Sequence, residues 1–241
     1  MTLSLSREGT EIKRLTLSEM TAIAPMADVD VDDPVYGRSK HYKAVPLKPL
    51  LKAAYGKIDD TQQFVIHASD GYAVSITGDI LTTDGAYLAF RDREAPSWEP
   101  IGPQKVSPAP LYMVWRGADQ RDMKTYPWPW AVLQFDAVSL DRLYAKASPG
   151  AEPTESVARG HELVLHRCIK CHPVNGQGGH LGPELNIPKN VTEYWPIEQI
   201  KSYVRDPSSL RYGNMPPNPD LSNQDLDDLV AYLSAMKDHK L

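Results

Sequence analysis

One short stretch, "HRCIKCHPVNG" at residues 166–176, constrains this chain more than any other. It holds both cysteines of the 241-residue sequence, Cys168 and Cys171, with His172 directly after them. Two cysteines this close together do not make a disulfide framework, so the motif is expected to serve chemistry. Three kinds of site use such a spacing: a structural zinc site, a redox-active dithiol and a covalent attachment point for haem.

The surrounding residues favour haem attachment. A structural zinc site needs four ligands, and no third cysteine or second histidine pair follows the motif at the usual spacing. A thioredoxin-like dithiol needs a βαβ setting, whereas this motif follows a helical pattern. In Cys-x-x-Cys-His, both thiols can reach one edge of a porphyrin, and the histidine is then held beneath the iron. Zinc and the dithiol stay open as alternatives.

A second iron ligand is expected from the loop "RYGNMPPNP" at residues 211–219. This Pro- and Gly-rich loop lies between two helical patterns, and it can present the thioether of Met215 to a metal. A methionine opposite a histidine fills both axial positions and raises the potential of the iron. The alternatives are that Met215 is an ordinary loop residue, or that His161, His166 or His180 supplies the second ligand.

Residues 155–241 are predicted to be all-helical. Apolar residues recur there at helical spacing, and the segment 145–156 before them is small, polar and interrupted by proline and glycine. The expected helix starts are marked by Thr154, by Pro196, and by the pair Ser222 and Asp225, which has the spacing of a capping box.

On these residues the C-terminal part resembles the class I, mitochondrial-type monohaem cytochrome c family. The matching pieces are Cys168-Ile-Lys-Cys171-His172, Gly182-Pro183-Glu-Leu185, the loop Tyr212-Gly-Asn-Met215-Pro216 and a last helix with Tyr232. The resemblance implies one covalently bound haem c, with His172 and Met215 as the ligands of its iron. It also implies a hydrogen bond from the axial histidine to the carbonyl of Pro183, which would orient the ring.

The same resemblance implies the remaining site residues. The cofactor-binding positions are Cys168, Cys171, Pro183, Leu185, Trp195 and Tyr212. The first and last helices of this family cross at a glycine against an aromatic ring, which points to Gly160 and Tyr232. The histidines of the first helix, His161 and His166, are expected in polar or exposed roles.

Residues 1–146 are predicted to form a separate α+β domain, joined by a linker at 147–156 to the cytochrome c domain at 157–241. Strands are expected at 63–69, 72–76, 111–115 and 130–138, where β-branched and aromatic residues cluster, and helices at 15–23 and 46–56. The acidic stretch "ADVDVDDP" at 27–34 is expected to be a solvated turn, because it lacks the glycine and distal glutamate of a calcium loop.

This first domain resembles the sulfite-oxidase-like molybdopterin-binding domain. The resemblance is carried by "YKAVPLKPLLKAA" at 42–54 and "HASDGYAVSI" at 67–76. In that family a cysteine thiolate ligates molybdenum, and this domain has no cysteine. The family's His-Gly-x-Pro-Leu-Arg stretch is reduced here to "PAPLYMVW", without the histidine or the arginine. We therefore expect a degenerate fold without the molybdenum cofactor.

The combined expectation is a periplasmic electron-transfer protein that exchanges electrons with redox partner proteins, its first domain serving docking or scaffolding. With both axial positions filled by protein, an electron carrier is favoured over an enzyme. The alternative is a redox enzyme or enzyme subunit whose first domain binds a cofactor and passes substrate electrons to the haem. The interspersed charges, net −5, exclude a nucleic-acid surface.

We expect neither a transmembrane segment nor a signal peptide in this sequence. No apolar run approaches the roughly 18 residues of a membrane span. The N-terminal residues lack the apolar core of a signal peptide, so we expect the export signal to be absent from this form of the chain.

Overall fold

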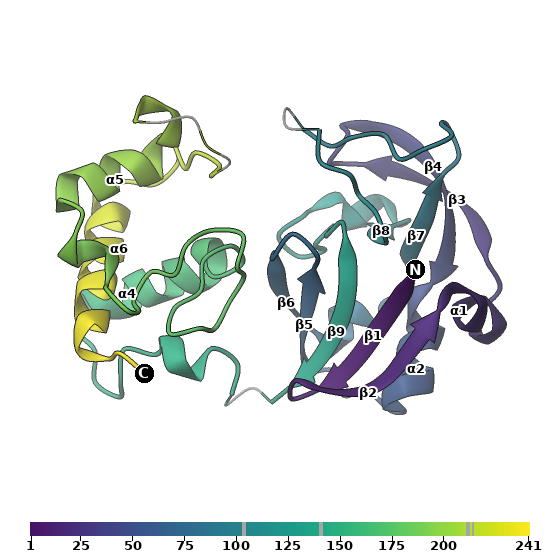
Figure 1. Ribbon diagram of the computed structural model, residues 1–241, viewed down its shortest axis with the longest axis horizontal. Helices are drawn as coiled ribbons and strands as arrows, with labels where there is room; N and C mark the ends of the chain where they lie inside the picture. Colours follow the sequence, from purple (N-terminus) through teal and green to yellow (C-terminus); the bar gives the residue numbers. More distant parts are fainter. Residues whose placement is uncertain (103–104, 140–141, 211–212, 214) are drawn as a thin grey trace. The chain divides into compact units, whose positions relative to one another are not determined.

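The computed structural model describes residues 1–102, 105–139, 142–210, 213 and 215–241. The chain divides into two compact units, Met1–Leu143 and Tyr144–Leu241, and Figure 1 shows that the first is rich in strands and the second in helices. Among the described residues, no helix is both long and apolar enough to cross a membrane.

The first unit is a mixed α/β, sheet-rich unit with two sheets. Its five-stranded sheet has the order β2-β1-β9-β5-β6, and its four-stranded sheet has the order β3-β4-β7-β8. Neighbouring strands are antiparallel except β1 and β9, which are parallel. The strands are β1 Thr2–Arg7, β2 Thr10–Thr16, β3 Ala27–Asp33, β4 Arg38–Pro46, β5 Gln63–Ala68, β6 Ala73–Thr77, β7 Ala86–Asp92, β8 Tyr112–Trp115 and β9 Val132–Val138.

One hydrophobic core holds this unit together. Strand alternation sends Leu3 and Leu5 of β1 into that core, while Ser4 between them faces away and stays partly exposed. Helices α1 (Leu17–Ile23), α2 (Leu47–Tyr55) and α3 (Gly78–Leu81) join the strands. The predicted helix end at Gly56 is confirmed, because this residue caps α2 with φ of 74°, a conformation that glycine adopts freely.

The expectation of a solvated turn at the acidic stretch 27–34 is wrong. We expected a turn there, but Ala27–Asp33 forms the edge strand β3. Its exposed aspartates meet basic side chains: Asp28 lies 3.0 Å from Lys43 on β4, and Asp30 lies 2.6 Å from His41 on the same strand. Cross-strand pairing with basic residues therefore lets an aspartate-rich sequence form a strand.

The second unit is a small helical bundle. Helix α4 (Glu155–Leu163) continues through a π-helical turn at Val164–Cys168, and α5 (Ile197–Arg205) and α6 (Asn223–Ala235) follow. The predicted caps are confirmed: the Thr154 hydroxyl accepts from the amide of Val157, and Ser222 forms a capping box with Asp225.

The boundary between the units lies between residues 143 and 144, three positions before the one that composition suggested. The difference arises because residues 145–147 pack on the second unit. The amide of Lys146 donates to Oε1 of Gln177 at 2.7 Å, and the carbonyl of the buried Ala147 accepts from the Tyr232 hydroxyl at 2.7 Å. A small, polar sequence is thus partly used as the first turn of the helical unit.

Helices α4 and α6 approach most closely at Gly160. A Cβ placed on this glycine would lie 2.8 Å from the Cβ of Tyr232 and 2.6 Å from the carbonyl carbon of Asp228. The crossing at a glycine against Tyr232 is therefore present as the resemblance implied. Because no side chain separates the two backbones, α4 and the chain that follows it have little freedom to shift against α6.

Candidate functional site

The cysteine motif occupies the end of the first helix of the second unit. Cys168 closes the π-helical turn, and its carbonyl accepts from the amides of Cys171 at 3.0 Å and His172 at 2.8 Å. These bonds wind residues 168–172 into a single turn, so both sulfur atoms and the imidazole belong to one rigid piece of backbone. Both cysteine residues keep some exposed surface, although the thiol of Cys168 is surrounded by protein.

The ring of His172 is oriented by Pro183. Its Nδ1 lies 2.8 Å from the Pro183 carbonyl oxygen. A carbonyl can only accept, so Nδ1 carries the proton and Nε2 keeps its lone pair. Burial lowers the pKa of His172, which favours the neutral ring. A neutral imidazole with one nitrogen held by a backbone carbonyl is the form in which histidine binds metals.

Gly182 packs directly against this ring. A Cβ on Gly182 would lie 2.6 Å from Nδ1 and 2.7 Å from Nε2 of His172, so only glycine fits there. Its amide donates to the carbonyl of Cys171 at 2.7 Å. The loop that carries Pro183 is therefore fastened to the cysteine motif by a backbone bond as well as by the histidine.

A single carboxylate, that of Glu184, shapes the next part of this loop. It accepts from the backbone amides of Asn175, Gly176 and Asn186, each at 2.9 Å. This residue was not predicted from the sequence, although it stands between the two matched positions Pro183 and Leu185. A carboxylate in a turn with several neighbouring amides is the signal that could have identified it.

A chain of three buried asparagines ties the loop to the rest of the unit. Asn190 donates to Asn186, and Asn186 donates to Asn175, both at 2.8 Å. Asn175 donates to the carbonyls of Lys146 and His239, and Asn190 to that of Leu233. These asparagines were not predicted from the sequence either. An asparagine in a loop indicates a turn, and the sequence does not show which distant residues it will bond.

The other predicted site residues lie in the same unit. Leu185 and Trp195 are partly buried, and the ring of Trp195 meets that of Tyr203 edge-on with centroids 5.3 Å apart. Met215 is partly buried in the segment before α6. Tyr212 lies outside the described residues. The structure thus joins the cysteines, His172 and Pro183 by direct bonds, while the approach of Met215 to that group stays a prediction.

The histidines considered as rivals have other surroundings. His166 and His180 are exposed. His161, expected in an exposed or polar role, is instead partly buried and stacked on Tyr232, with ring centroids 5.3 Å apart and planes 25° apart. Burial lowers the pKa of His161. The contact between α4 and α6 holds this ring in place.

The chemistry of Cys168 does not match a redox dithiol. Burial raises the pKa of its thiol to about 12. The attacking cysteine of a dithiol enzyme is a thiolate, which needs a lowered pKa. Two thiols on one turn, followed directly by an oriented imidazole, are compatible with a c-type haem site, and the covalent attachment stays a prediction.

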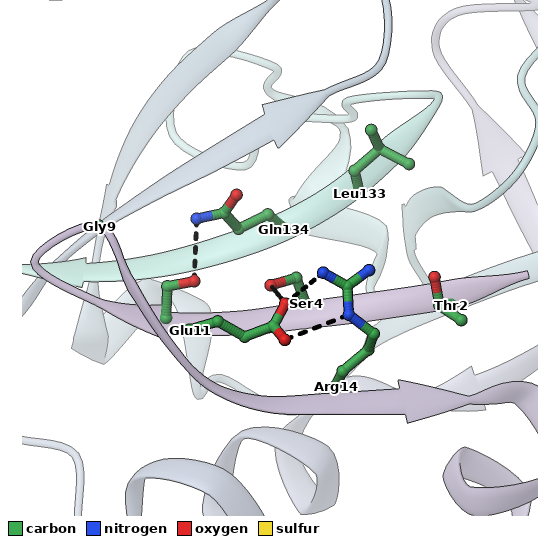
Figure 2. Close-up of a pocket in the computed structure, with 8 residues that line it drawn as sticks. Thr2, Ser4, Gly9, Glu11, Arg14, Leu133 and Gln134 are labelled. Carbon is green, nitrogen blue, oxygen red and sulfur yellow. Dashed lines mark hydrogen bonds and ion pairs between the residues drawn. The ribbon is translucent and has the colours of Figure 1, made fainter.

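The first unit presents a shallow polar hollow of about 260 Å³ on its five-stranded sheet (Figure 2). Figure 2 shows Arg14 and Ser4 both directed at the carboxylate of Glu11. The side-chain amide of Gln134 donates to the hydroxyl of Ser6 at 3.0 Å. These polar groups bind one another, so the hollow offers no converging set of donors for a cofactor.

Comparison with known proteins supports the assignment of the second unit. Residues 157–237 match the family model described as cytochrome c, and this part of the chain is a cytochrome c domain. The domain implies a haem cofactor and redox partners. The chain is also 33% identical over 124 residues to a protein named cytochrome c oxidase subunit 2 from Alkalihalophilus pseudofirmus. That alignment covers 44% of this chain and 35% of the relative, so the chain spans about a third of the relative's length.

Proposed function

We propose that this chain is a periplasmic electron carrier with one haem c, attached through Cys168 and Cys171 and ligated by His172 and Met215. The observation that carries the proposal is the 2.8 Å contact between Nδ1 of His172 and the Pro183 carbonyl. It leaves Nε2 as a lone-pair donor on the residue that directly follows the second cysteine, which suits a ligand of haem iron.

The protein's part in the reaction is to keep the site unchanged while an electron enters or leaves. When bound, the haem iron supplies a centre that changes its charge by one without making or breaking bonds. Pro183 keeps the imidazole from rotating, and Gly182 leaves no gap for it to tilt into. The thioether of Met215 would hold the iron as a second protein ligand and favour its reduced state.

In this proposal the first unit serves docking or scaffolding. It has no cysteine to ligate molybdenum, and Glu11, Arg14 and Gln134 in its hollow are bonded to other side chains of the unit. Covalent haem attachment takes place outside the cytoplasm, which supports the periplasm as the compartment.

Optical spectroscopy of the purified full chain tests the haem assignment. Replacing Met215 with alanine should remove the weak methionine-to-iron band at the red end of the oxidised spectrum and let carbon monoxide bind the reduced protein. Met123→Ala, at an exposed methionine of the first unit, is the matched control and should change neither. If the band survives in Met215→Ala, or if the unaltered protein binds carbon monoxide, the ligand assignment fails.

Covalent attachment is tested separately. Acidified organic solvent should leave haem on the unaltered chain and extract it from a Cys168→Ser, Cys171→Ser double variant. Complete extraction from both would refute covalent attachment.

A second candidate is the alternative raised from the sequence, and the relative named cytochrome c oxidase subunit 2 is compatible with either candidate. In this second candidate the chain is a redox enzyme or enzyme subunit, and its first unit binds a cofactor that passes substrate electrons to the haem. Metal analysis by mass spectrometry separates the two. One iron and no molybdenum per chain supports the carrier, whereas stoichiometric molybdenum supports the enzyme.

A further inference from the structure

The first unit contains a buried carboxylate that two tyrosines share. Asp33, the last residue of β3, has no exposed surface. It accepts from the hydroxyl of Tyr42 at 2.9 Å and from that of Tyr112, whose oxygen lies 3.1 Å from both carboxylate oxygens. Both tyrosines are also fully buried. Neither the haem site nor the hollow in Figure 2 uses these three groups.

Further aromatic rings connect this group with the protein surface. Trp98, which is only partly buried, lies 5.9 Å from Tyr42 and 6.5 Å from Tyr112, measured between ring centroids. Tyr42 and Tyr112 are 5.8 Å apart, and Trp128 follows at 6.2 Å from Tyr112. Tyrosine and tryptophan are the side chains that lose a single electron most easily, and rings at these separations exchange one readily.

Loss of an electron from a phenol makes its hydroxyl strongly acidic. In an apolar interior the resulting charge is costly unless the proton can leave at once along an existing hydrogen bond. Asp33 provides that acceptor. Burial raises the pKa of Asp33, so this carboxyl retains a proton more readily than a solvated aspartate does.

We propose that Tyr112 and Asp33 form a proton-coupled redox pair that traps oxidising radicals. An oxidising radical takes one electron through the aromatic chain and is reduced to its anion. Tyr112 is oxidised, its O–H bond breaks, and the proton forms a new O–H bond on Asp33. The products are a neutral tyrosyl radical and a neutral carboxylic acid, so no net charge is created in the core.

Tyr112 is assigned as the resting place of the radical because its hydroxyl lies 3.1 Å from both oxygens of Asp33, whereas that of Tyr42 meets one of them and its ring also faces Lys40. The ammonium group of this buried lysine lies 5.8 Å from the ring centroid of Tyr42 and 4.9 Å from that of Tyr36. A nearby cation opposes the removal of an electron from a ring. Three carboxylates surround the ammonium group, those of Asp92, Glu94 and Glu99. The ammonium faces the rings of Tyr36 and Tyr42, and these carboxylates reduce its opposition to their oxidation.

Flash photolysis of the ferric holoprotein tests the proposal, with a photogenerated ruthenium(III) polypyridyl complex as the one-electron oxidant. Electron paramagnetic resonance should show a tyrosyl radical in the unaltered chain. Tyr112→Phe should slow the formation of the tyrosyl radical by roughly tenfold, which corresponds to about 1.4 kcal/mol in the barrier, and should lower its yield accordingly. Tyr87→Phe, at a partly buried tyrosine on the same core, is the control and should leave the yield unchanged.

Asp33→Asn tests the proton acceptor, because an amide fills the same space but takes up no proton. It should lower the tyrosyl yield by a similar factor and shift the remaining signal to tryptophan. If this variant does not fold, a measurement on the unaltered chain tests the proton acceptor instead. With an internal acceptor, the rate of radical formation should not change with the concentration of buffer base. A rate that rises with buffer, or a full yield in Tyr112→Phe, would overturn the proposal.

Discussion

Placing a methyl group at Gly160 should destabilise the second unit, although alanine is the better helix former. Gly160 lies in the middle of α4, where replacing glycine with alanine ordinarily gains about 1 kcal/mol. Here the new Cβ would lie 2.8 Å from the Cβ of Tyr232 and 2.6 Å from the carbonyl carbon of Asp228. Carbon atoms in contact are about 3.5–4.0 Å apart, so the helices must separate by about 1 Å.

The two effects oppose each other, and packing should win. Added volume in a well-packed core costs about 1–3 kcal/mol, and the upper end applies because one of the opposing atoms is backbone, which cannot rotate away. Subtracting the helical gain of about 1 kcal/mol leaves a loss of about 2 kcal/mol for Gly160→Ala. In a unit of about 100 residues this lowers Tm by about 10 °C.

Thermal unfolding followed by far-UV circular dichroism measures this shift, since the helical signal comes mainly from the second unit. Gly213→Ala is the control, because among the described residues the atom that its Cβ would meet is the Tyr203 hydroxyl oxygen, at an ordinary 3.7 Å. An unchanged or raised Tm for Gly160→Ala would show that helix propensity outweighs packing. That result would refute the close approach of α4 and α6 at Gly160.

Three further predictions concern buried polar groups. Bonds from Arg159 lower the pKa of Asp228 from 3.8 to about 2. The stabilisation of the fold by these bonds should therefore be complete above about pH 4 and be lost as the pH falls from about 4 towards 2. The free energy of unfolding in urea should follow this pH dependence in the unaltered chain and depend less on pH in Asp228→Asn. Lys40→Met should cost about 3–5 kcal/mol in the free energy of unfolding by leaving Asp92 as a buried, unpaired charge, and adding Asp92→Asn should recover part of it. Asn186→Ala, measured in the same way, should cost about 1–3 kcal/mol for each partner left unsatisfied.

The helical unit was predictable because its signals are local. The cap at Thr154, the capping box at Ser222 and the cysteine motif each act within a few residues, and the structure contains them where the sequence indicates. The strands were harder. β3 was mistaken for a turn because its aspartates are compatible with a strand only next to the basic residues of β4, which the sequence does not show as neighbours.

The hydrogen bonds that hold the site residues in place could not be predicted from the sequence for a related reason. The bond from His172 to Pro183 was expected only through a family resemblance, since nothing in the spacing fixes it. The bonds of Asn175 reach residues 29 and 64 positions away in the sequence. Such partners are set by the way the chain folds back on itself, and residue types alone do not identify them.

The side chain of Asn175 also determines how the second unit can be joined to other chains. One amide nitrogen holds the carbonyl of Lys146 at 2.8 Å and that of His239 at 2.6 Å. The polypeptide therefore enters and leaves this unit at nearly the same point, a geometry that tolerates insertion and circular permutation. Such a unit can be spliced into a surface loop of a host protein or fused at either end, because neither operation requires its two ends to be pulled apart.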